Sequence, residues 1–399
     1  MRLEPLIHLI SSHLDKSLSE SFRRTGSLFA YVFMFSLGFG ITIPAVPLFA
    51  RDIGVTYMGV GFIGVAYGLS YTILAIPLGG LSDRVGRKAI MAFASILSLV
   101  ASSLYLFASR SEHLILIRAV EGVAWAGYLP VVEASSADIS SETKHGWAMG
   151  LFASLYGAGF ALGCLISGSI VEIAGYRAAF LFYSLTSCAG LIFAITQTPR
   201  STIMPTRTAH SNIERTTEKG AGHPLFYACL LSATYSIVLA TILFLFPAYA
   251  RDLGFGVFSI GAMLTSFWIS RIASFLTLGN VSDRVGRNTI LLPALAAMTI
   301  ASILLILNNF PALILSIVML GISTGAIFPV TIALISDEVS KSQRGVAMGY
   351  FETASAAGQT IAPLVGGFLA QTFDPRFPFI FCALISVSCA IVIFKMVKP

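Results

Sequence analysis

Apolar runs of about 20 residues recur from end to end of the chain, and they limit its fold more than any other feature. A run of this length crosses the hydrocarbon core of a bilayer as a helix. A transmembrane β-barrel would show segments of about ten residues that alternate between apolar and polar positions. Only 11% of the residues are charged, whereas a soluble domain has about 25%. The sequence therefore predicts an all-α membrane protein and excludes an ordinary soluble enzyme.

Charged residues and turn formers divide the apolar runs into twelve segments. We expect each segment to form one transmembrane helix, so that the chain crosses the membrane twelve times. The expected helices cover residues 27-49, 57-80, 89-108, 113-136, 146-170, 178-196, 225-249, 257-279, 289-307, 311-335, 345-370 and 378-396.

The positions of Lys and Arg predict the orientation in the membrane. With the N-terminus in the cytoplasm, the inner segments hold 18 Lys and Arg residues and the outer segments hold five. Membrane proteins carry such an excess on their cytoplasmic side. We therefore expect a multi-pass protein of the cytoplasmic (inner) membrane with both termini in the cytoplasm. This topology accounts for the net charge of +6, and we expect no nucleic-acid partner.

The two halves of the chain repeat each other. Ala50-Arg51-Asp52 recurs as Ala250-Arg251-Asp252, and Ser82 to Arg87 recurs as Ser282 to Arg287, both at a shift of 200. Each half has six predicted helices, so the halves have the same orientation and are parallel repeats. Transporters built from such repeats bind their substrate between them. The sequence therefore predicts a site between the halves.

A polar stretch over residues 197-224 separates the halves and is interpreted as a cytoplasmic linker. It joins an N-terminal six-helix bundle, residues 27-196, to a C-terminal bundle, residues 225-399. Residues 1-26 form a cytoplasmic N-terminal tail. Apolar residues at helical spacing in this tail favour an interfacial helix, with a disordered tail as the alternative.

One loop carries a family resemblance. The segment Gly79 to Lys88, with the sequence GGLSDRVGRK, resembles the signature loop of the major facilitator superfamily, and Gly279 to Asn288 is a degenerate copy. The resemblance covers essentially the whole chain. It implies twelve helices in two pseudo-symmetric six-helix bundles.

Two further motifs relate to subfamilies. Leu114-xxx-Arg118-xx-Glu121-Gly122 is similar to the second motif of proton-coupled members, in which the position of Glu121 is more often Gln. An incomplete copy of the drug-antiporter motif lies in the first half, at Gly159, Gly163 and Gly168. This copy lacks the proline of the motif. A closer copy occurs in the second half, at Gly358, Pro363, Gly366 and Gly367. Close helix packing is the simpler interpretation of these glycines.

The signature loops predict a cytoplasmic latch between the halves. Gly79, Gly86 and Gly286 allow tight turns, and Arg84 and Arg284 stay on the cytoplasmic side. Asp83 and Asp283 are placed to accept hydrogen bonds from the first N–H groups of the helices 345-370 and 146-170, respectively. The resemblance implies further ion pairs of Arg87 with Asp138 and of Arg287 with Asp337. A role limited to the turn and the topology is the alternative.

Five ionisable residues lie within predicted helices, where charges are costly. Arg118 and Glu121, three apart, either neutralise each other or form a proton site. Glu133 is either a second proton carrier or a structural hydrogen-bond acceptor. Arg271 and Glu352 are expected to form an ion pair, because the family packs their helices side by side; contact of Arg271 with an anionic substrate is the alternative.

These features predict a secondary active transporter that exports small amphipathic organic compounds in exchange for protons. The alternative is a proton-coupled symporter or facilitator for a small metabolite such as a sugar or organic anion. A receptor without transport activity fits poorly with the buried acids, and no nucleophile-base pair indicates an enzyme. We expect a monomer without cofactor. A metal site is not expected, because no pair of histidines has ligand spacing.

Overall fold

The computed structural model describes residues 4–139, 145–196, 222–339 and 344–397, and these are almost entirely helical. Side chains are described from Gly26 onward, apart from that of Asn280 and a few beside these gaps. The helices are α1 (Glu4–Asp52), α2 (Tyr57–Val85), α3 (Arg87–Tyr105), α4 (Ser111–Ile139), α5 (His145–Thr196), α6 (Gly222–Phe244), α7 (Phe246–Asp252), α8 (Val257–Val285), α9 (Arg287–Leu304), α10 (Phe310–Glu338), α11 (Arg344–Thr372) and α12 (Phe377–Val397).

The twelve predicted crossings can be followed in these helices. The long helix α5 contains two of them, because Gly175 has φ 79° and ψ 173° and interrupts the helix there. The seventh crossing is divided between α6 and α7 at Leu245, two residues before Pro247, as a proline within a helix leads one to expect.

Length and composition support membrane crossing for most of these helices. Among the described residues, ten helices are long and apolar enough to cross a membrane, the longest being Met149–Thr196. Helix α11 is not among them, and it carries polar residues such as Glu352, Gln359 and Thr360. Two of these three, Glu352 and Gln359, line an internal cavity described below, which is where polar groups of a membrane helix are tolerated.

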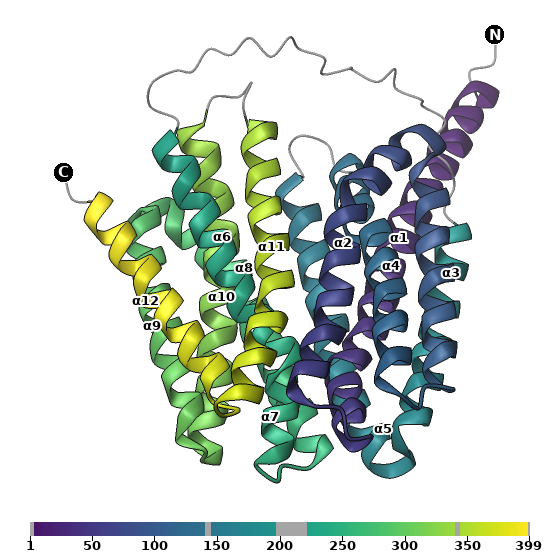
Figure 1. Cartoon of the computed structure of the whole chain (residues 1–399). Helices are drawn as coiled ribbons and strands as arrows, with labels where there is room; N and C mark the ends of the chain where they lie inside the picture. Colours follow the sequence, from purple (N-terminus) through teal and green to yellow (C-terminus); the bar gives the residue numbers. More distant parts are fainter. Residues whose placement is uncertain (1–3, 140–144, 197–221, 340–343, 398–399) are drawn as a thin grey trace.

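The helices form two groups that stand side by side in Figure 1. Within the first half, α1 packs on α5, and α4 on α2 and α3; within the second, α6 packs on α11, and α10 on α8 and α9. The halves meet along a seam made by α5 with α8 and by α2 with α11. Each seam pair maps onto the other when α2 is matched to α8 and α5 to α11. The predicted fold of two pseudo-symmetric six-helix bundles is confirmed.

The turns after α2 and α8 show how closely the halves correspond. Gly86 and Gly286 have φ 95° and 93°, and each N–H donates to a serine carbonyl, of Ser82 or Ser282, at 3.0 Å. Only glycine adopts this backbone conformation at low cost. Each glycine ends one helix and begins the next, so that the chain reverses within a single residue.

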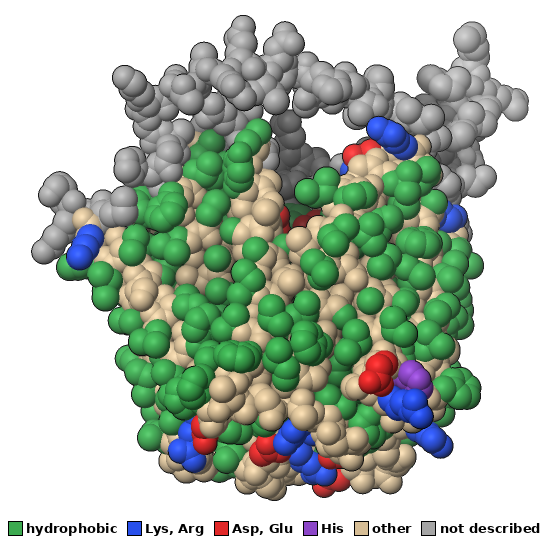
Figure 2. Space-filling view, viewed as in Figure 1, with side chains coloured by type: hydrophobic (Ala, Val, Ile, Leu, Met, Phe, Trp, Pro, Cys, Tyr) green, Lys and Arg blue, Asp and Glu red, His purple; other side chains and the backbone are tan. Residues whose placement is uncertain are grey.

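Figure 2 shows hydrophobic side chains over the flank of the molecule and charged groups at its rims. The large exposed apolar side chains include Ile76, Phe107 and Ile173, each more than three-quarters exposed. A soluble protein rarely leaves so much apolar surface uncovered, so this flank fits contact with lipid.

The long helices run between two ends of the molecule, a linker end and a far end. The linker end is where α5 ends at Thr196 and α6 begins at Gly222. The far end is where α1 ends at Asp52 and α7 ends at Asp252.

Candidate functional site

A cavity of about 200 Å³ lies between the two halves. A water molecule needs roughly 10–15 Å³ of such volume, so the cavity has room for a small organic molecule. Both halves contribute to its wall, through α1, α2, α4 and α5 on one side and α6, α8, α10 and α11 on the other. Figure 2 shows a recess between the halves at the linker end, with acidic atoms inside it.

Aromatic rings make up much of this wall. They are Phe39, Tyr67, Tyr71, Trp125, Phe152, Tyr156, Phe160, Tyr235, Phe244, Trp268, Phe275 and Phe328. Phe160 of the first half stacks on Trp268 of the second, with ring centroids 4.4 Å apart. Rings offer large apolar contact area together with faces that attract cations. The wall therefore suits a flat, partly apolar molecule.

Arg118 and Glu121 form a buried ion pair on α4. Nη1 of Arg118 lies 3.0 Å from Oε2 of Glu121, and the two side chains are 4% and 0% exposed. The Tyr105 hydroxyl donates to the same Oε2 at 2.8 Å, and Arg118 donates to Oγ1 and the carbonyl oxygen of Thr42 at 3.3 and 3.2 Å. The predicted mutual neutralisation of the two charges is confirmed as geometry; a proton site here stays a prediction.

Glu133 on α4 and Glu352 on α11 line the cavity from opposite halves. They are close enough for their charges to interact. Glu352 is exposed to the cavity, and Glu133 is half-buried. Within the described part of the chain, neither carboxylate has a cation within ion-pair distance. Two carboxyl groups thus share one internal space.

The expected ion pair between Arg271 and Glu352 is wrong for this structure. Helix α8 packs on α5 and α10, whereas α11 packs on α2 and α6, so these two helices are not neighbours. Both residues instead line the cavity. The Arg271 guanidinium lies 5.7 Å from the ring centre of Trp268 and 5.8 Å from that of Tyr235. Its Nη1 is buried and finds no hydrogen-bond partner among the described residues.

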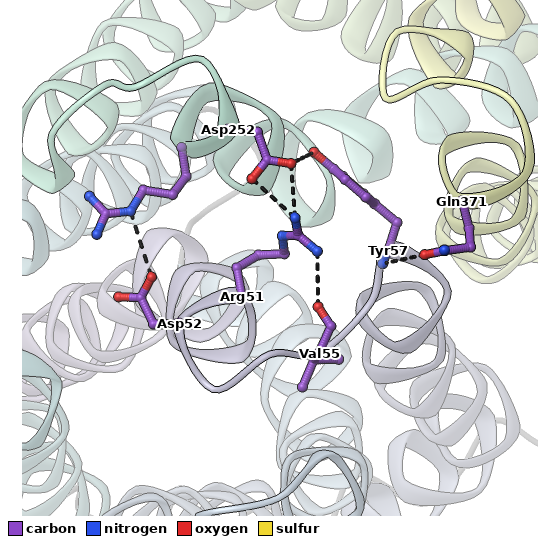
Figure 3. A network of polar contacts seen from close by, with 7 residues as sticks. Arg51, Asp52, Val55, Tyr57, Asp252 and Gln371 are labelled. Atoms are coloured by element: carbon purple, nitrogen blue, oxygen red, sulfur yellow. Dashed lines mark hydrogen bonds and ion pairs between the residues drawn. The ribbon is translucent and has the colours of Figure 1, made fainter.

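The far end is closed by ion pairs that cross between the halves (Figure 3). Nη2 of Arg51 lies 2.9 and 3.1 Å from the two carboxylate oxygens of Asp252. The symmetry-related pair, Arg251 with Asp52, has its closest atoms 3.6 Å apart. Each copy of the Ala-Arg-Asp repeat thus supplies its arginine to the aspartate of the other copy.

Neighbouring groups reinforce this closure. The Tyr57 hydroxyl donates to Asp252 at 2.7 Å, and the Tyr57 N–H donates to Gln371 at 3.2 Å. Glu172 of the first half accepts from the N–H of Phe258, in the first turn of α8, at 2.9 Å. The sequence showed the repeat but not these contacts. The signal was present, because each copy carries both signs of charge at the end of a predicted helix.

At the linker end, one predicted latch pair is present. Nε of Arg287 lies 2.9 Å from Asp337, which confirms this prediction, and Arg287 also pairs with Asp283. All three residues belong to the second half, so these pairs alone do not join the halves.

The other latch residues are only partly described. Asp83, Arg84 and Arg284 are exposed at the linker end, and Gly79 and Gly279 lie against Pro130 and Pro329. Asp138 and the first residues of α5 and α11 have side chains outside the described residues. The contacts of Asp83 and Asp283 with these helix starts, and the pair of Arg87 with Asp138, therefore stay predictions.

The motif glycines lie at close helix crossings. A Cβ at Gly159 would come 2.8 Å from the Phe33 carbonyl oxygen of α1, and one at Gly358 would come 2.8 Å from that of Ala233 in α6. Gly168 and Gly367 contact α8 and α2 across the seam, and the other motif residues pack equally tightly: Gly163 on α1, Pro363 on α2 and Gly366 on Leu245. Backbone contact of this kind explains the need for glycine.

In the part of the chain that the structure describes, no group of three His, Cys, Asp or Glu side chains is arranged to hold a metal ion. The polar groups of the cavity are the two carboxyl groups, the two guanidinium groups and a few hydroxyl and amide groups. This set can bind an organic molecule and exchange protons.

Relatives of this chain are transporters. A Methanocaldococcus jannaschii MFS-type transporter is 23% identical over 372 residues, which cover 91% of this chain and 95% of the relative. The multidrug resistance protein MdtG of Proteus mirabilis is 24% identical over 88% of this chain and 90% of its own length. MdtG of Salmonella heidelberg is 26% identical, with 92% and 91% covered.

Solved structures share the fold. The nucleoside transporter NupG has a TM-score of 0.73 and 16% identity, covering 94% of this chain and 100% of its own. A bacterial homolog of the human lysosomal transporter Spinster, inward-facing and occupied, has a TM-score of 0.75 and 14% identity, with 93% and 95% covered. The family model of the Major Facilitator Superfamily matches residues 28–232 and 225–399. This chain, a multi-pass membrane transporter and not an enzyme, belongs to the Major Facilitator Superfamily.

Proposed function

We propose that the protein exports small amphipathic organic compounds by proton antiport, binding them in the cavity between its halves. The observation that carries this proposal is the pair of cavity carboxyl groups, Glu133 from one half and Glu352 from the other. Ionised carboxylates attract either a proton or a cationic group of a cargo molecule. Competition between the two for the same carboxylates couples cargo movement to proton movement in the opposite direction.

The state of the two ends supports alternating access. Ion pairs cross between the halves at the far end, and the cavity opens as a recess at the linker end. The excess of Lys and Arg in the linker-end segments favours a cytoplasmic position for that end. On this assignment the structure represents an inward-facing state of an inner-membrane protein. Rocking of the halves about the seam then exposes the cavity to the outside.

The aromatic wall and the relatives support a drug-like cargo. Twelve aromatic rings line the cavity, so an apolar aromatic cargo can pack against them without forming hydrogen bonds. Relatives that align over most of their length are named multidrug resistance proteins.

Proton movement in everted membrane vesicles tests the proposal. Respiration acidifies the vesicle interior, and aromatic amines and other amphipathic compounds are then added outside. We expect such compounds to release protons from vesicles that contain the wild-type protein. Vesicles with the Glu133→Gln or Glu352→Gln protein should release fewer protons, because the amide does not titrate.

Glu112→Gln is the matched control, since Glu112 is an exposed carboxylate at the start of α4, away from the cavity. It should behave as wild type. Antiport is refuted if no compound releases protons although the protein is folded and monodisperse.

A symporter or facilitator of a small organic anion is the second candidate. It is favoured by Arg271, a cavity cation without a carboxylate partner among the described residues. A symporter predicts that an anion and a proton cross together, so that an inward anion gradient acidifies the vesicle interior, whereas a facilitator moves the anion without a proton.

A further inference from the structure

Resting on the proposed antiport, we propose that the preferred cargo is amphoteric: an aromatic body that carries both an amine and a carboxylate. Its anionic group binds Arg271 of the second half. Its amine binds between Glu133 and Glu352. This assigns Arg271 as the residue that selects amphoteric compounds over simple cations.

Of the two cavity arginines, Arg118 is already neutralised. Its guanidinium contacts Glu121 at 3.0 Å and donates twice to Thr42. Removing it from these partners to bind cargo would leave Glu121 as a buried, unbalanced charge, which is costly. Arg118 is therefore part of the wall and does not recognise an anion.

Arg271 has the opposite surroundings. No carboxylate of the described residues lies within 4.0 Å of it, and its electrostatic partners are the hydroxyl groups of Tyr235 and Tyr156. Its Nη1 is buried with no acceptor among those same residues. A guanidinium at membrane depth without a counter-ion is costly, and two parallel N–H groups match a carboxylate. An anionic group of the cargo supplies the missing partner.

Proton antiport requires, in addition, that the cargo carries a cationic group. If the cargo were only an anion, it would bind better when Glu133 and Glu352 are protonated, because ionised carboxylates repel it. Cargo and protons would then move together. Competition with protons requires a cationic group at these carboxylates. A compound with both charges satisfies Arg271 and the carboxylates at once.

The geometry allows one molecule to reach both sites. Glu133, Arg271 and Glu352 line the same cavity from α4, α8 and α11. The other titratable side chains that face this space are Tyr67, Tyr71, Tyr156, Tyr235 and Arg118. The tyrosines carry no positive charge, and the charge of Arg118 is balanced by Glu121. The rings of Trp125, Phe160 and Trp268 line the same cavity. The aromatic body packs on these rings, while its anionic group contacts Arg271 of the second half and its amine contacts both halves, at Glu133 and Glu352.

Three naphthalene compounds test the inference by binding to purified protein in nanodiscs. They are 6-(aminomethyl)-2-naphthoic acid, 2-(aminomethyl)naphthalene and 2-naphthoic acid, which share one ring system and differ in charge. We expect the amphoteric compound to bind about 10-fold or more tightly than either singly charged one, as one additional charged hydrogen-bonded contact provides.

Variants assign the two ends of the cargo. Arg271→Gln should weaken binding of the amphoteric compound about 10-fold and leave the amine unchanged or bound more tightly. Arg271→Lys, which keeps the charge, should restore part of the loss. Glu352→Gln should weaken both the amine and the amphoteric compound. Arg110→Gln, in an exposed loop, is the matched control and should change none of them.

The outcomes separate this inference from the proposed function. If the amine releases protons from everted vesicles but the amphoteric compound binds no better than the amine, antiport stands and this inference is overturned. The inference is also overturned if Arg271→Gln, folded by size-exclusion chromatography and thermal melting, weakens all three compounds equally. If only the naphthoic acid moves, together with protons, the proposed antiport itself fails.

Discussion

Arg51 and Asp252 join the two halves of this transporter at the far end, with Nη2 of Arg51 2.9 Å from Oδ2 of Asp252. Arg251 and Asp52 form the symmetry-related pair at 3.6 Å. Because each pair takes one residue from each half, both pairs must break when the far end opens. They therefore stabilise the state that is closed at this end relative to the state that is open there.

We expect Asp252→Asn to favour opening of the far end. The side chains of Arg51 and Asp252 are 25% and 34% exposed, so the ion pair contributes only about 0.2–1 kcal/mol. The amide still accepts from Tyr57, but this hydrogen bond is weakened by about 1 kcal/mol because its acceptor is no longer charged. A loss of about 1–2 kcal/mol raises the open population about 5- to 30-fold. Distances between spin labels at Ile173 and Phe310, in a cysteine-free background, report this shift by pulsed electron resonance.

The exchanged pair is the control. Arg51→Asp combined with Asp252→Arg restores opposite charges across the seam and should return part of the closed population. If the exchanged pair opens as far as Asp252→Asn does, the ion pair does not stabilise the closed state.

The buried pair of Arg118 and Glu121 should matter more for stability. Glu121→Ala leaves the Arg118 guanidinium buried without its counter-ion and removes the acceptor of the Tyr105 hydroxyl. We expect the free energy of unfolding to fall by about 3–5 kcal/mol, and by less for Glu121→Gln, which keeps an acceptor. Unfolding of the purified protein by denaturant measures this change.

A double variant isolates the coupling in this pair. Arg118→Leu with Glu121→Leu removes both charges, so it should cost clearly less than the sum of the two single leucine substitutions. Additive losses would mean that the two side chains stabilise the protein independently.

The fold was predictable because its signals are local. Run length predicts each helix, and the turn glycines Gly86 and Gly286 mark two of the reversals at the linker end. The repeat of Ala50-Arg51-Asp52 at residues 250–252 predicts the symmetry of the two halves. The helix and turn signals each lie within a short segment, and the repeat is found by comparing two segments of the sequence, so none of them requires knowledge of packing.

The site was predictable only in part, because its contacts join distant segments. The pair of Arg118 and Glu121 lies within one helix turn, and spacing predicts it correctly. The pairing of Arg271 with Glu352 depends on which helices are neighbours, and the expectation failed because α8 packs on α5 and α10. The pairs of Arg51 with Asp252 and of Arg251 with Asp52 cross between the halves. Their prediction requires the position of the symmetry axis, which the sequence alone does not contain.

Gly86 provides a test of the backbone in the turn after α2. With φ 95° it adopts a conformation that is strained for any other residue, although nothing lies within 4 Å of the position of a Cβ. Gly86→Ala should therefore lower the free energy of unfolding by about 1–3 kcal/mol through backbone strain alone. Thermal unfolding in detergent measures the loss.

Gly80→Ala is the matched control for this turn. Gly80 lies in α2, is exposed and also has nothing within 4 Å, so alanine should be neutral or stabilise the helix by about 0.5–1 kcal/mol. Equal losses for Gly80→Ala and Gly86→Ala would show that the backbone conformation of Gly86 is not the cause.

Gly367 tests the seam between the halves. A Cβ there would lie 2.8 Å from the carbonyl oxygen of Tyr57 and 3.0 Å from the Cα of Gly61, both on α2 of the other half. Backbone atoms cannot move aside without shifting a helix, so Gly367→Ala should force α2 and α11 apart. Because this contact lies near the far end, we expect the variant to populate the far-end-open state more than wild type does.

The same spin labels at Ile173 and Phe310 measure this effect. Alanine substitutions of two other glycines serve as controls. Gly349→Ala, on α11 with nothing within 4 Å, should leave the distances unchanged. Gly358→Ala meets α6 within its own half, so it should lower stability without moving the halves apart. Identical distance distributions for Gly367→Ala and wild type would mean that α2 and α11 accommodate the added methyl group without opening the far end. The contact would then affect packing but not conformation.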